Sequence, residues 1–459
     1  MLGLHLLDSG VAIARDGEAL GPSPSPSIVF GVATPQPGAV ALDSYRARPR
    51  DVSTNHWARI ATDGADAPEA LAVASAELRV RFGALPEAVR TEPVMVAVPS
   101  GWGGGALSVA LGLLRQSGAQ VTGFIDAALL AGLRSAGEAS LLVFEIGLHH
   151  FTATRIDRDS GRWHRRGSRT TRRFGLLALQ DVWLQLVSEA MVRRTRFDPL
   201  HDAATEQALF DQLMAGAAAA ARDGQAEIRI EGRQDAASQA FAVTLTRDQF
   251  AARAAEIYRD WLRCAHALRP AGMPMTLVVP ARVEALPGFA AELDSFAGCQ
   301  LHVLGSDEIA SAASRWSTAS ETEGDGSLQM RRQLDSRTVA GLADGLASTA
   351  ERELVAVRGG AAPTHALYAG RAWSLRSTVL EIGREAAGGI VVPDGAAGVS
   401  RLHCSLIDEG GDIVLVDHSR YGCFVNGERV AGRARLRAGD TLRIGDPGIE
   451  CTLIAVGSG

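Results

Sequence analysis

The sequence contains no lysine, so all 46 of its basic residues are arginines. This absence excludes every mechanism that depends on a lysine ammonium group. A P-loop needs a lysine on the phosphates, protein kinases need a strand lysine, and Schiff-base enzymes need a lysine amine. A general compositional bias towards arginine, alanine and glycine is the simplest origin of this pattern, and the exclusion holds whatever the origin.

Cysteine is also scarce. The five cysteines, Cys264, Cys299, Cys404, Cys423 and Cys451, are odd in number and show no CxxC spacing. This pattern predicts neither a disulfide framework nor a zinc site. We therefore expect free, buried thiols and no bound metal.

Long apolar runs and an excess of positive charge are missing as well. No stretch of about 18 apolar residues occurs, and residues 1–16 do not form a charged-then-apolar leader, so we expect a cytoplasmic protein with no membrane contact. The 52 acidic residues outnumber the basic ones and give a net charge of −6. This balance argues against general binding to nucleic acid, and any anion site must be local.

The 459 residues are enough for about three domains. Residues 311–328 are rich in Ser, Thr, Glu and Gly and indicate a domain boundary, and a second break at 359–363 precedes short β-like segments. Because apolar strands alternate with alanine-rich helical stretches before the boundary, the first region is predicted to be α/β. We expect a first domain over 1–318, a linker with possible short elements over 319–362, and an all-β domain over 363–456.

Several elements of the first region are predicted individually. Strands are expected at 2–7, 94–98, 141–144, 226–230, 242–245 and 276–279, and helices at 106–116, 176–192 and 247–268. Thr246 and Asp248 suit the start of the last helix. The segment 330–357 is assigned to neither neighbouring domain.

The last 90 or so residues read as short strands joined by Gly, Asp and Pro turns, which is typical of a β-sandwich. Their turn residues are Gly383-Arg384, Ser400-x-x-His403, Gly422 and Asn426-Gly427. In order and spacing they resemble the forkhead-associated (FHA) domain family. The resemblance implies phosphothreonine binding, with Arg384 and Ser400 on the phosphate and Arg401 beside them. It also implies a structural role for Gly383, His403 and Gly422, and turn geometry for Asn426 and Gly427.

One position departs from that family. The loop before Gly422 usually carries Thr-Asn, whereas this chain has Arg420-Tyr421. We expect both residues at the peptide surface, with Arg420 on the phosphate or on an acidic neighbour. Tyr421 would pack against the peptide or donate its hydroxyl. The alternative is an FHA fold that is blind to phosphate and serves only protein contact; the presence of both Arg384 and Ser400 argues against it.

Scattered segments of the first region carry a second resemblance. They include Asp8-Ser9-Gly10, VMVAVPSGW at 94–102, GFIDAALLAGL at 123–133 and FEIG at 144–147. Together they resemble the actin-like ATPase superfamily, specifically the nucleotide-binding domain of DnaK-type chaperones. The resemblance implies two lobes that close on Mg-ATP. Asp8, Ser9 and Gly10 would form one phosphate turn, Glu145 and Gly147 the other, and Asp126 would hold magnesium-bound water.

The expected catalytic parts are altered at four places. The second phosphate turn reads EIGLHH instead of Asp-x-Gly-Gly-Gly-Thr, the catalytic lysine cannot exist, and Arg59 is only a nearby cation. Val279-Pro280 replaces an expected Gly-Gly, and alanine-rich sequence at 214–223 replaces the adenosine helix. Because phosphoryl transfer needs these groups jointly, we predict a pseudo-ATPase without catalytic residues or cofactor. Binding of Mg-ATP or Mg-ADP, with no turnover or a slow one, is the alternative.

These observations predict a cytoplasmic, non-enzymatic signalling adaptor. Its FHA domain would bind a phosphothreonine protein made by an upstream Ser/Thr kinase, and its ATPase-like body would bind a second protein. The alternative is a nucleotide-binding, slowly hydrolysing ATPase whose lobe closure regulates partner binding. A third hypothesis places a phosphorylated Thr318, Thr322 or Thr338 of the linker in the FHA site in cis.

Overall fold

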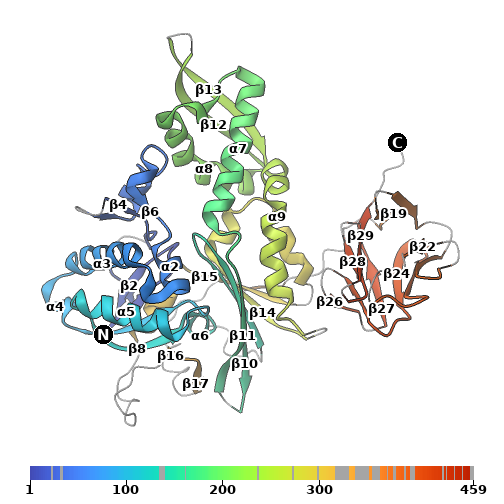
Figure 1. Ribbon diagram of the computed structural model, residues 1–459, viewed down its shortest axis with the longest axis horizontal. Coiled ribbons are helices and arrows are strands. Elements are labelled where there is room, and N and C mark those ends of the chain that lie inside the picture. Colours follow the sequence, from blue (N-terminus) through green and yellow to red (C-terminus); the bar gives the residue numbers. More distant parts are fainter. Residues whose placement is uncertain are drawn as a thin grey trace. The chain divides into compact units, whose positions relative to one another are not determined.

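Two units make up the chain in the computed structural model (Figure 1). The first spans Met1–Leu268, Pro274–Leu293 and Gly298–Leu354, and the second spans Arg269–Met273, Asp294–Ala297 and Val355–Gly459. The structure describes residues 1–21, 24–31, 35–133, 140–160, 162–234, 237–270, 273–296, 299–315, 330–335, 351–353, 362–369, 371–375, 379–386, 389–392, 398–425, 428–430, 432–438, 440–446 and 448–454. Asn426, Gly427 and the three linker threonines lie outside these residues.

The first sheet of the first unit has the order β16-β8-β7-β1-β2-β3. Its strands are β1 (Leu2–His5), β2 (Ala12–Arg15), β3 (Glu18–Ala19), β7 (Pro93–Val98), β8 (Gln120–Asp126) and β16 (Met330–Arg331). The first three form an antiparallel meander, and β7 and β8 continue the sheet parallel to β1.

The second sheet repeats this arrangement. Its order is β17-β11-β10-β9-β14-β15-β18. The strands are β9 (Ser140–Ile146), β10 (Phe151–Asp159), β11 (Arg162–Thr171), β14 (Thr276–Pro280), β15 (Gln300–Leu304), β17 (Gln333–Asp335) and β18 (Glu351–Glu353). Strands β9, β10 and β11 form an antiparallel meander, and β14 and β15 run parallel to β9. The two sheets therefore share one strand topology, third-second-first-fourth-fifth.

Two smaller sheets and a set of helices complete the unit. The small sheets are β5-β4-β6, from β4 (Val29–Phe30), β5 (Gln36–Pro37) and β6 (Val52–Ser53), and the hairpin of β12 (Gln225–Gln234) and β13 (Ala237–Thr246). The α-helices are α1 (Ala39–Leu42), α2 (His56–Asp63), α3 (Pro68–Gly83), α4 (Glu87–Arg90), α5 (Gly104–Gln116), α6 (Ala127–Ala131), α7 (Leu176–Thr195), α8 (Ala203–Asp223), α9 (Arg247–His266), α10 (Phe289–Glu292) and α11 (Glu308–Ser314). Short 3-10 turns lie at 49–51, 64–66, 199–201, 281–285 and 293–296.

The helices cover the sheets through apolar faces. One cluster joins α2, α3 and α5 to β1 and β7, for example through Ile60, Leu78 and Val96. A second cluster joins α6 and α11 to β8 and β9, for example through Ile125 and Leu141. Helix α11 approaches β1 so closely that a Cβ on Gly3 would lie 2.1 Å from the Ala310 carbonyl oxygen.

The strands and helices predicted individually are confirmed within a few residues, and so is the α/β class of the first region. Helix α9 begins as expected, because Thr246 accepts from the Gln249 amide and the Gln249 side chain accepts from the Thr246 amide. The segment that the sequence left unassigned adds β16, β17 and β18 to the edges of the two large sheets.

The second unit is a sandwich of two sheets, β20-β19-β29-β28-β25-β26 and β22-β21-β23-β24-β27. The strands are β19 (His365–Tyr368), β20 (Arg371–Ser374), β21 (Leu380–Gly383), β22 (Ile390–Val391), β23 (Cys404–Glu409), β24 (Asp412–Asp417), β25 (Cys423–Val425), β26 (Glu428–Arg429), β27 (Arg433–Leu436), β28 (Thr441–Ile444) and β29 (Ile449–Ile454). Alternate residues of both sheets, such as Leu406, Leu415 and Leu453, form its core.

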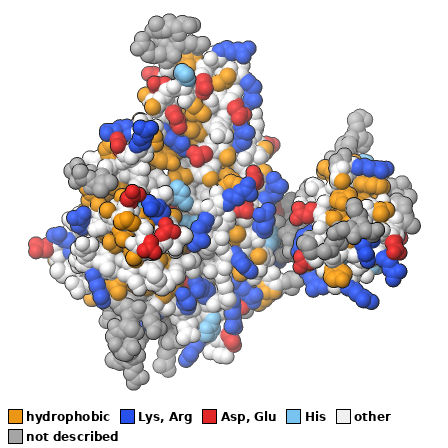
Figure 2. Space-filling view, viewed as in Figure 1, with side chains coloured by type: hydrophobic (Ala, Val, Ile, Leu, Met, Phe, Trp, Pro, Cys, Tyr) orange, Lys and Arg blue, Asp and Glu red, His pale blue; other side chains and the backbone are white. Residues whose placement is uncertain are grey.

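Cysteines and charges follow the expected pattern. All five thiols are free, and all but Cys264 are buried. On the face drawn in Figure 2, arginines and acidic residues are interspersed over the first unit. Within the described part of the chain, no helix combines the length and apolarity that a membrane span requires.

Candidate functional sites

The predicted phosphate-binding residues lie on two loops of the second unit that are joined by backbone hydrogen bonds. The amide of Arg384 donates to the Ser400 carbonyl at 3.1 Å, and the amide of Glu385 donates to the Arg401 carbonyl at 2.9 Å. Arg384 and Arg401 are exposed, and Ser400 is half-buried. Two guanidinium groups and a hydroxyl thus start from adjacent backbone at the end of β21.

Gly383 makes this pairing possible. A Cβ at this position would lie 2.1 Å from the Arg401 carbonyl oxygen. Such an approach is closed to any residue with a side chain, because the atom in the way belongs to the backbone. The glycine therefore sets the distance between the Arg384 loop and the Ser400 loop.

His403 connects the Ser400 loop to the loop that carries Arg420 and Tyr421. The imidazole is fully buried. Its Nδ1 accepts from the Ser400 amide at 3.0 Å, so its proton lies on Nε2, which donates to the Gly422 carbonyl at 3.1 Å. One ring thus bonds to both loops.

The side chains of Asp417 and Ser419 fix the backbone of the Arg420–Tyr421 loop through hydrogen bonds. The carboxylate of Asp417 accepts from the amides of Ser419 at 2.9 Å and Cys423 at 3.1 Å, and these bonds lower its pKa against the effect of burial. The Ser419 hydroxyl accepts from the Gly422 amide at 2.7 Å. This anchoring leaves the side chains of Arg420 and Tyr421 exposed on the loop surface.

Gly422 ends this loop in the left-handed region, with φ +84°. A Cβ there would lie 2.7 Å from Nε of Arg429, so the Arg429 side chain packs directly on the glycine. A residue other than glycine would meet both strain and a clash at this point.

His403, Asp417 and Cys423 also form a possible metal-ligand set, since their donor atoms lie within 4.8 Å of one another. The imidazole and carboxylate already bond to loop backbone. Their present contacts explain the cluster as the structural support of the two loops.

Comparison with known protein families identifies the second unit and not the first. Residues 380–445 match the family model of the FHA domain, so the chain contains an FHA domain there. Such a domain implies binding of phosphothreonine peptides. The match lies outside residues 1–318, and no curated protein matches the chain. The likeness of the first unit to DnaK-type chaperones therefore stays a prediction.

In the first unit, the two predicted phosphate turns face each other. The turn that carries Asp8, Ser9 and Gly10 follows β1, and the turn at 147–150 follows β9, the equivalent strand of the second sheet. The Ser9 hydroxyl donates to the Ile146 carbonyl at 2.5 Å, and the Leu148 amide donates to Asp8 Oδ1 at 2.9 Å. The two turns are thus bonded directly to each other.

His150 fills the space beside the second turn. A Cβ on Gly147 would lie 2.2 Å from the His150 ring and 2.8 Å from Asp8 Oδ1. The His150 Nδ1 lies 3.8 Å from Asp8 Oδ2. An imidazole therefore packs on the backbone of Gly147. This imidazole belongs to the EIGLHH segment, which replaces the glycines expected in the second phosphate turn.

Asp126 is paired with an arginine. Its carboxylate, 0 % exposed, accepts from the Ser100 hydroxyl at 2.5 Å and from Arg165 Nη1 at 3.1 Å. Arg165 Nη1 also donates to the Ser100 carbonyl. Burial raises the pKa of Asp126, and the bonds to Ser100 and Arg165 oppose that effect. The Arg165 guanidinium is thus paired with the carboxylate to which the family resemblance assigns the binding of magnesium-bound water.

Glu145 stands in the same buried cluster. Its Oε2 accepts from the Ser100 amide at 3.3 Å, and its Oε1 has no hydrogen-bond partner. Burial, and then the nearby charge of Asp126, raise the pKa of Glu145 to about 8. The carboxyl is therefore mostly protonated near neutral pH, so it adds little negative charge to that of Asp126 in the buried cluster.

Arg282, which the sequence did not single out, closes the first turn. Its Nη2 donates to the Ser9 carbonyl at 3.2 Å and would lie 3.3 Å from a Cβ on Gly10. It follows β14, on the 3-10 turn that begins after Val279-Pro280. No local pattern marks it, because its partner lies 273 residues away in the sequence.

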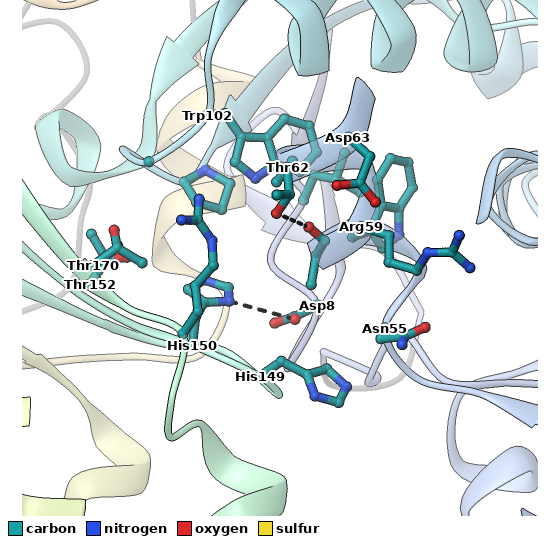
Figure 3. A pocket seen from close by; sticks show the side chains of 17 residues that line it. Asp8, Asn55, Arg59, Thr62, Asp63, Trp102, His149, His150, Thr152 and Thr170 are labelled. Carbon is teal, nitrogen blue, oxygen red and sulfur yellow. Dashed lines mark hydrogen bonds and ion pairs between the residues drawn. The ribbon is translucent and has the colours of Figure 1, made fainter. Parts of the chain in front are cut away.

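A pocket of about 270 Å³ opens next to this cluster (Figure 3). Asp8 lies at its centre in the view, with His149 and His150 on one side and the α2 residues Arg59, Thr62 and Asp63 on the other. Arg59 bonds to Glu69 at 3.2 Å. Among the predicted nucleotide residues, only Asp8 lines the pocket; Ser9, Gly10, Asp126, Glu145 and Gly147 do not.

Proposed function

We propose that this protein is a cytoplasmic adaptor that binds a phosphothreonine protein through its FHA domain and a second protein through its first unit. The observation that carries the proposal is the exposed Arg384 beside Ser400, on two loops joined by backbone hydrogen bonds, with the Ser400 loop braced by His403. Each charge-assisted hydrogen bond to a phosphate contributes about 1.5–3 kcal/mol. A few such bonds from Arg384, Ser400 and Arg401 support micromolar binding. The phosphoprotein requires an upstream Ser/Thr kinase.

We further propose that the first unit is an actin-like ATPase fold of DnaK type that has lost catalysis. The repeated strand order of the two large sheets supports this assignment, as does the meeting of the β1 and β9 turns at Asp8 and Gly147. Duplicated sheets whose strands end at a common cleft are what a two-lobed nucleotide-binding fold requires.

Loss of catalysis is supported by three side chains of the protein itself. Arg165 pairs with Asp126, Arg282 bonds to the Ser9 carbonyl, and His150 packs on Gly147. Asp126, Ser9 and Gly147 are thus in contact with side chains of the protein itself, whereas Asp8 lines the pocket. The surface of this unit is then available to a partner protein.

A second candidate function is regulated nucleotide binding. It is favoured by Asp8 Oδ2 and Glu145 Oε1, two buried carboxyl oxygens without hydrogen-bond partners that a donor or a hydrated cation would satisfy. In this case lobe closure on Mg-ATP would change the affinity for a partner.

Two titrations of the full chain test these proposals. Phosphothreonine peptides from a degenerate library should bind at micromolar concentration, and Arg384→Ala should abolish that binding while Arg435→Ala leaves it unchanged. Arg435 is the matched control because it pairs with Asp412 on β24. Calorimetry with Mg-ATP and Mg-ADP should show no heat of binding at millimolar nucleotide; micromolar binding would replace the adaptor proposal by the second candidate.

A further inference from the structure

The FHA loop end carries more positive charge than one phosphate uses. Arg384, Arg401, Arg420 and Arg429 are all exposed. Among the described residues, the ion pairs of this unit join Arg433 to Glu409, Arg435 to Asp412 and Arg443 to Asp446. None of these four takes part in them; we call them the loop arginines, of which Arg384, Arg401 and Arg420 lie on loops and Arg429 lies on the short strand β26 beside Gly422. Arg433, Arg435 and Arg443 are therefore neutralised, whereas the loop arginines are not.

The four loop arginines belong to one connected piece of structure. Arg384 and Arg401 start from loops paired by two backbone hydrogen bonds. The His403 ring joins the Ser400 amide to the Gly422 carbonyl, two residues after Arg420. Arg429 lies on Gly422 itself. The loop that carries Arg420 is therefore held beside the loop that carries Ser400.

Few acidic groups on these loops are free to balance that charge. Both carboxylate oxygens of Asp417 already accept hydrogen bonds, one from the Ser419 amide and the other from the Cys423 amide. Glu385 is exposed next to Arg384. Among the described residues of these loops, four guanidinium groups stand against one free carboxylate, a net charge of about +3 that exceeds in magnitude the charge of about −1.5 to −2 on one phosphothreonine.

From this arrangement we infer that Arg420 selects phosphothreonine peptides that carry a second acidic group, a Glu, an Asp or another phosphate, close to the phosphothreonine. This inference rests on the proposed function of the FHA domain and names the peptide class that it takes. Arg420 stands on a loop whose backbone is fixed by Asp417 and Ser419. Little backbone conformational entropy is therefore lost when its guanidinium binds a carboxylate. Tyr421, 53 % exposed, supplies an amphipathic surface beside it.

The test uses the full chain and synthetic peptides read by fluorescence anisotropy. A reference peptide carries phosphothreonine between alanines, and a series places one glutamate at each flanking position in turn. The best glutamate peptide should bind about tenfold more tightly than the reference, as expected for one added charge-assisted contact. Its unphosphorylated form should not bind, which excludes simple attraction between opposite net charges.

Variants separate this inference from the proposed function. Arg420→Asn should reduce the ratio of the two affinities, glutamate peptide over reference peptide, from about tenfold to about one, while Arg435→Asn should keep that ratio. Arg420 is exposed and outside the core, and equal melting temperatures of the variants verify that folding is unchanged. If the neutral peptide binds in an Arg384-dependent way but no glutamate improves it, or Arg420→Asn keeps the gain, the inference is wrong and the proposed function stands. If no phosphothreonine peptide binds, both fail.

Discussion

Replacing Glu145 by glutamine should stabilise the first unit at high pH and lose that effect at low pH. The pKa of Glu145 is raised from 4.5 to about 8, chiefly by burial. Between these values the folded state holds more protons than the unfolded state, so the free energy of unfolding falls as the pH rises. At about 1.4 kcal/mol per pH unit, the ionised carboxylate costs the folded state about 5 kcal/mol above pH 8.

The glutamine removes that charge but leaves one buried amide group with incomplete bonding, which costs about 1–3 kcal/mol. We therefore expect a net gain of about 1.5–3.5 kcal/mol at pH 8 and a net loss of about 0.5–2.5 kcal/mol near pH 4.5. Urea unfolding followed by tryptophan fluorescence measures the difference, since Trp57, Trp102, Trp163, Trp183 and Trp261 are all buried in this unit.

The matched control is Glu69→Gln, because the Glu69 side chain is 85 % exposed. Its effect on stability should stay within about 0.5 kcal/mol over the same pH range. A difference between Glu145→Gln and the parent chain that does not change from pH 4.5 to pH 8, or that shrinks as the pH rises, would refute this reasoning.

Two further perturbations have defined outcomes. The buried Glu77 carboxylate bonds to the side chains of Ser27, His56, Trp57 and Arg81. Burial alone would raise its pKa, but His56 and Arg81 lower the pKa to about 2. Glu77→Gln should cost about 3 kcal/mol in urea unfolding at pH 7, because Arg81 loses its buried partner; the parent chain should lose this contribution as the pH falls from 4.5 towards 2. Gly147→Ala should cost about 1–3 kcal/mol, since the new methyl group meets His150 and Asp8, and a melting temperature equal to that of the parent would contradict this packing.

Much of the second unit could be predicted from its turn residues. Its turn residues follow one another at a spacing that resembles the FHA family, and the roles of Gly383, His403 and Gly422 were expected through that resemblance. Gly422 meets a local requirement, since its φ is +84°, whereas Gly383 and His403 contact residues of other loops. In the first unit, the alternation of apolar residues predicted β12 and β13, and the Thr246 cap predicted the start of α9. Local chemistry of this kind is visible in a single sequence.

The centre of the first unit could be predicted only in part. The sequence predicts an obstructed turn at Gly147, and His150 packs there. Arg165 and Arg282 were missed, because each reaches a partner that only the tertiary fold brings near. The edge strands β16, β17 and β18 were expected only as possible short elements of a linker, since segments of two or three residues become strands only by pairing with a sheet already formed.

In our proposal, phosphothreonine binding, and not nucleotide chemistry, is the activity of this chain. The most direct test measures the affinity of the full chain for a phosphothreonine peptide without nucleotide, with saturating Mg-ADP and with saturating Mg-ATP. The adaptor account predicts one micromolar affinity in all three conditions, and its loss in Arg384→Ala. An affinity that changes severalfold with nucleotide, or that survives Arg384→Ala, would contradict it.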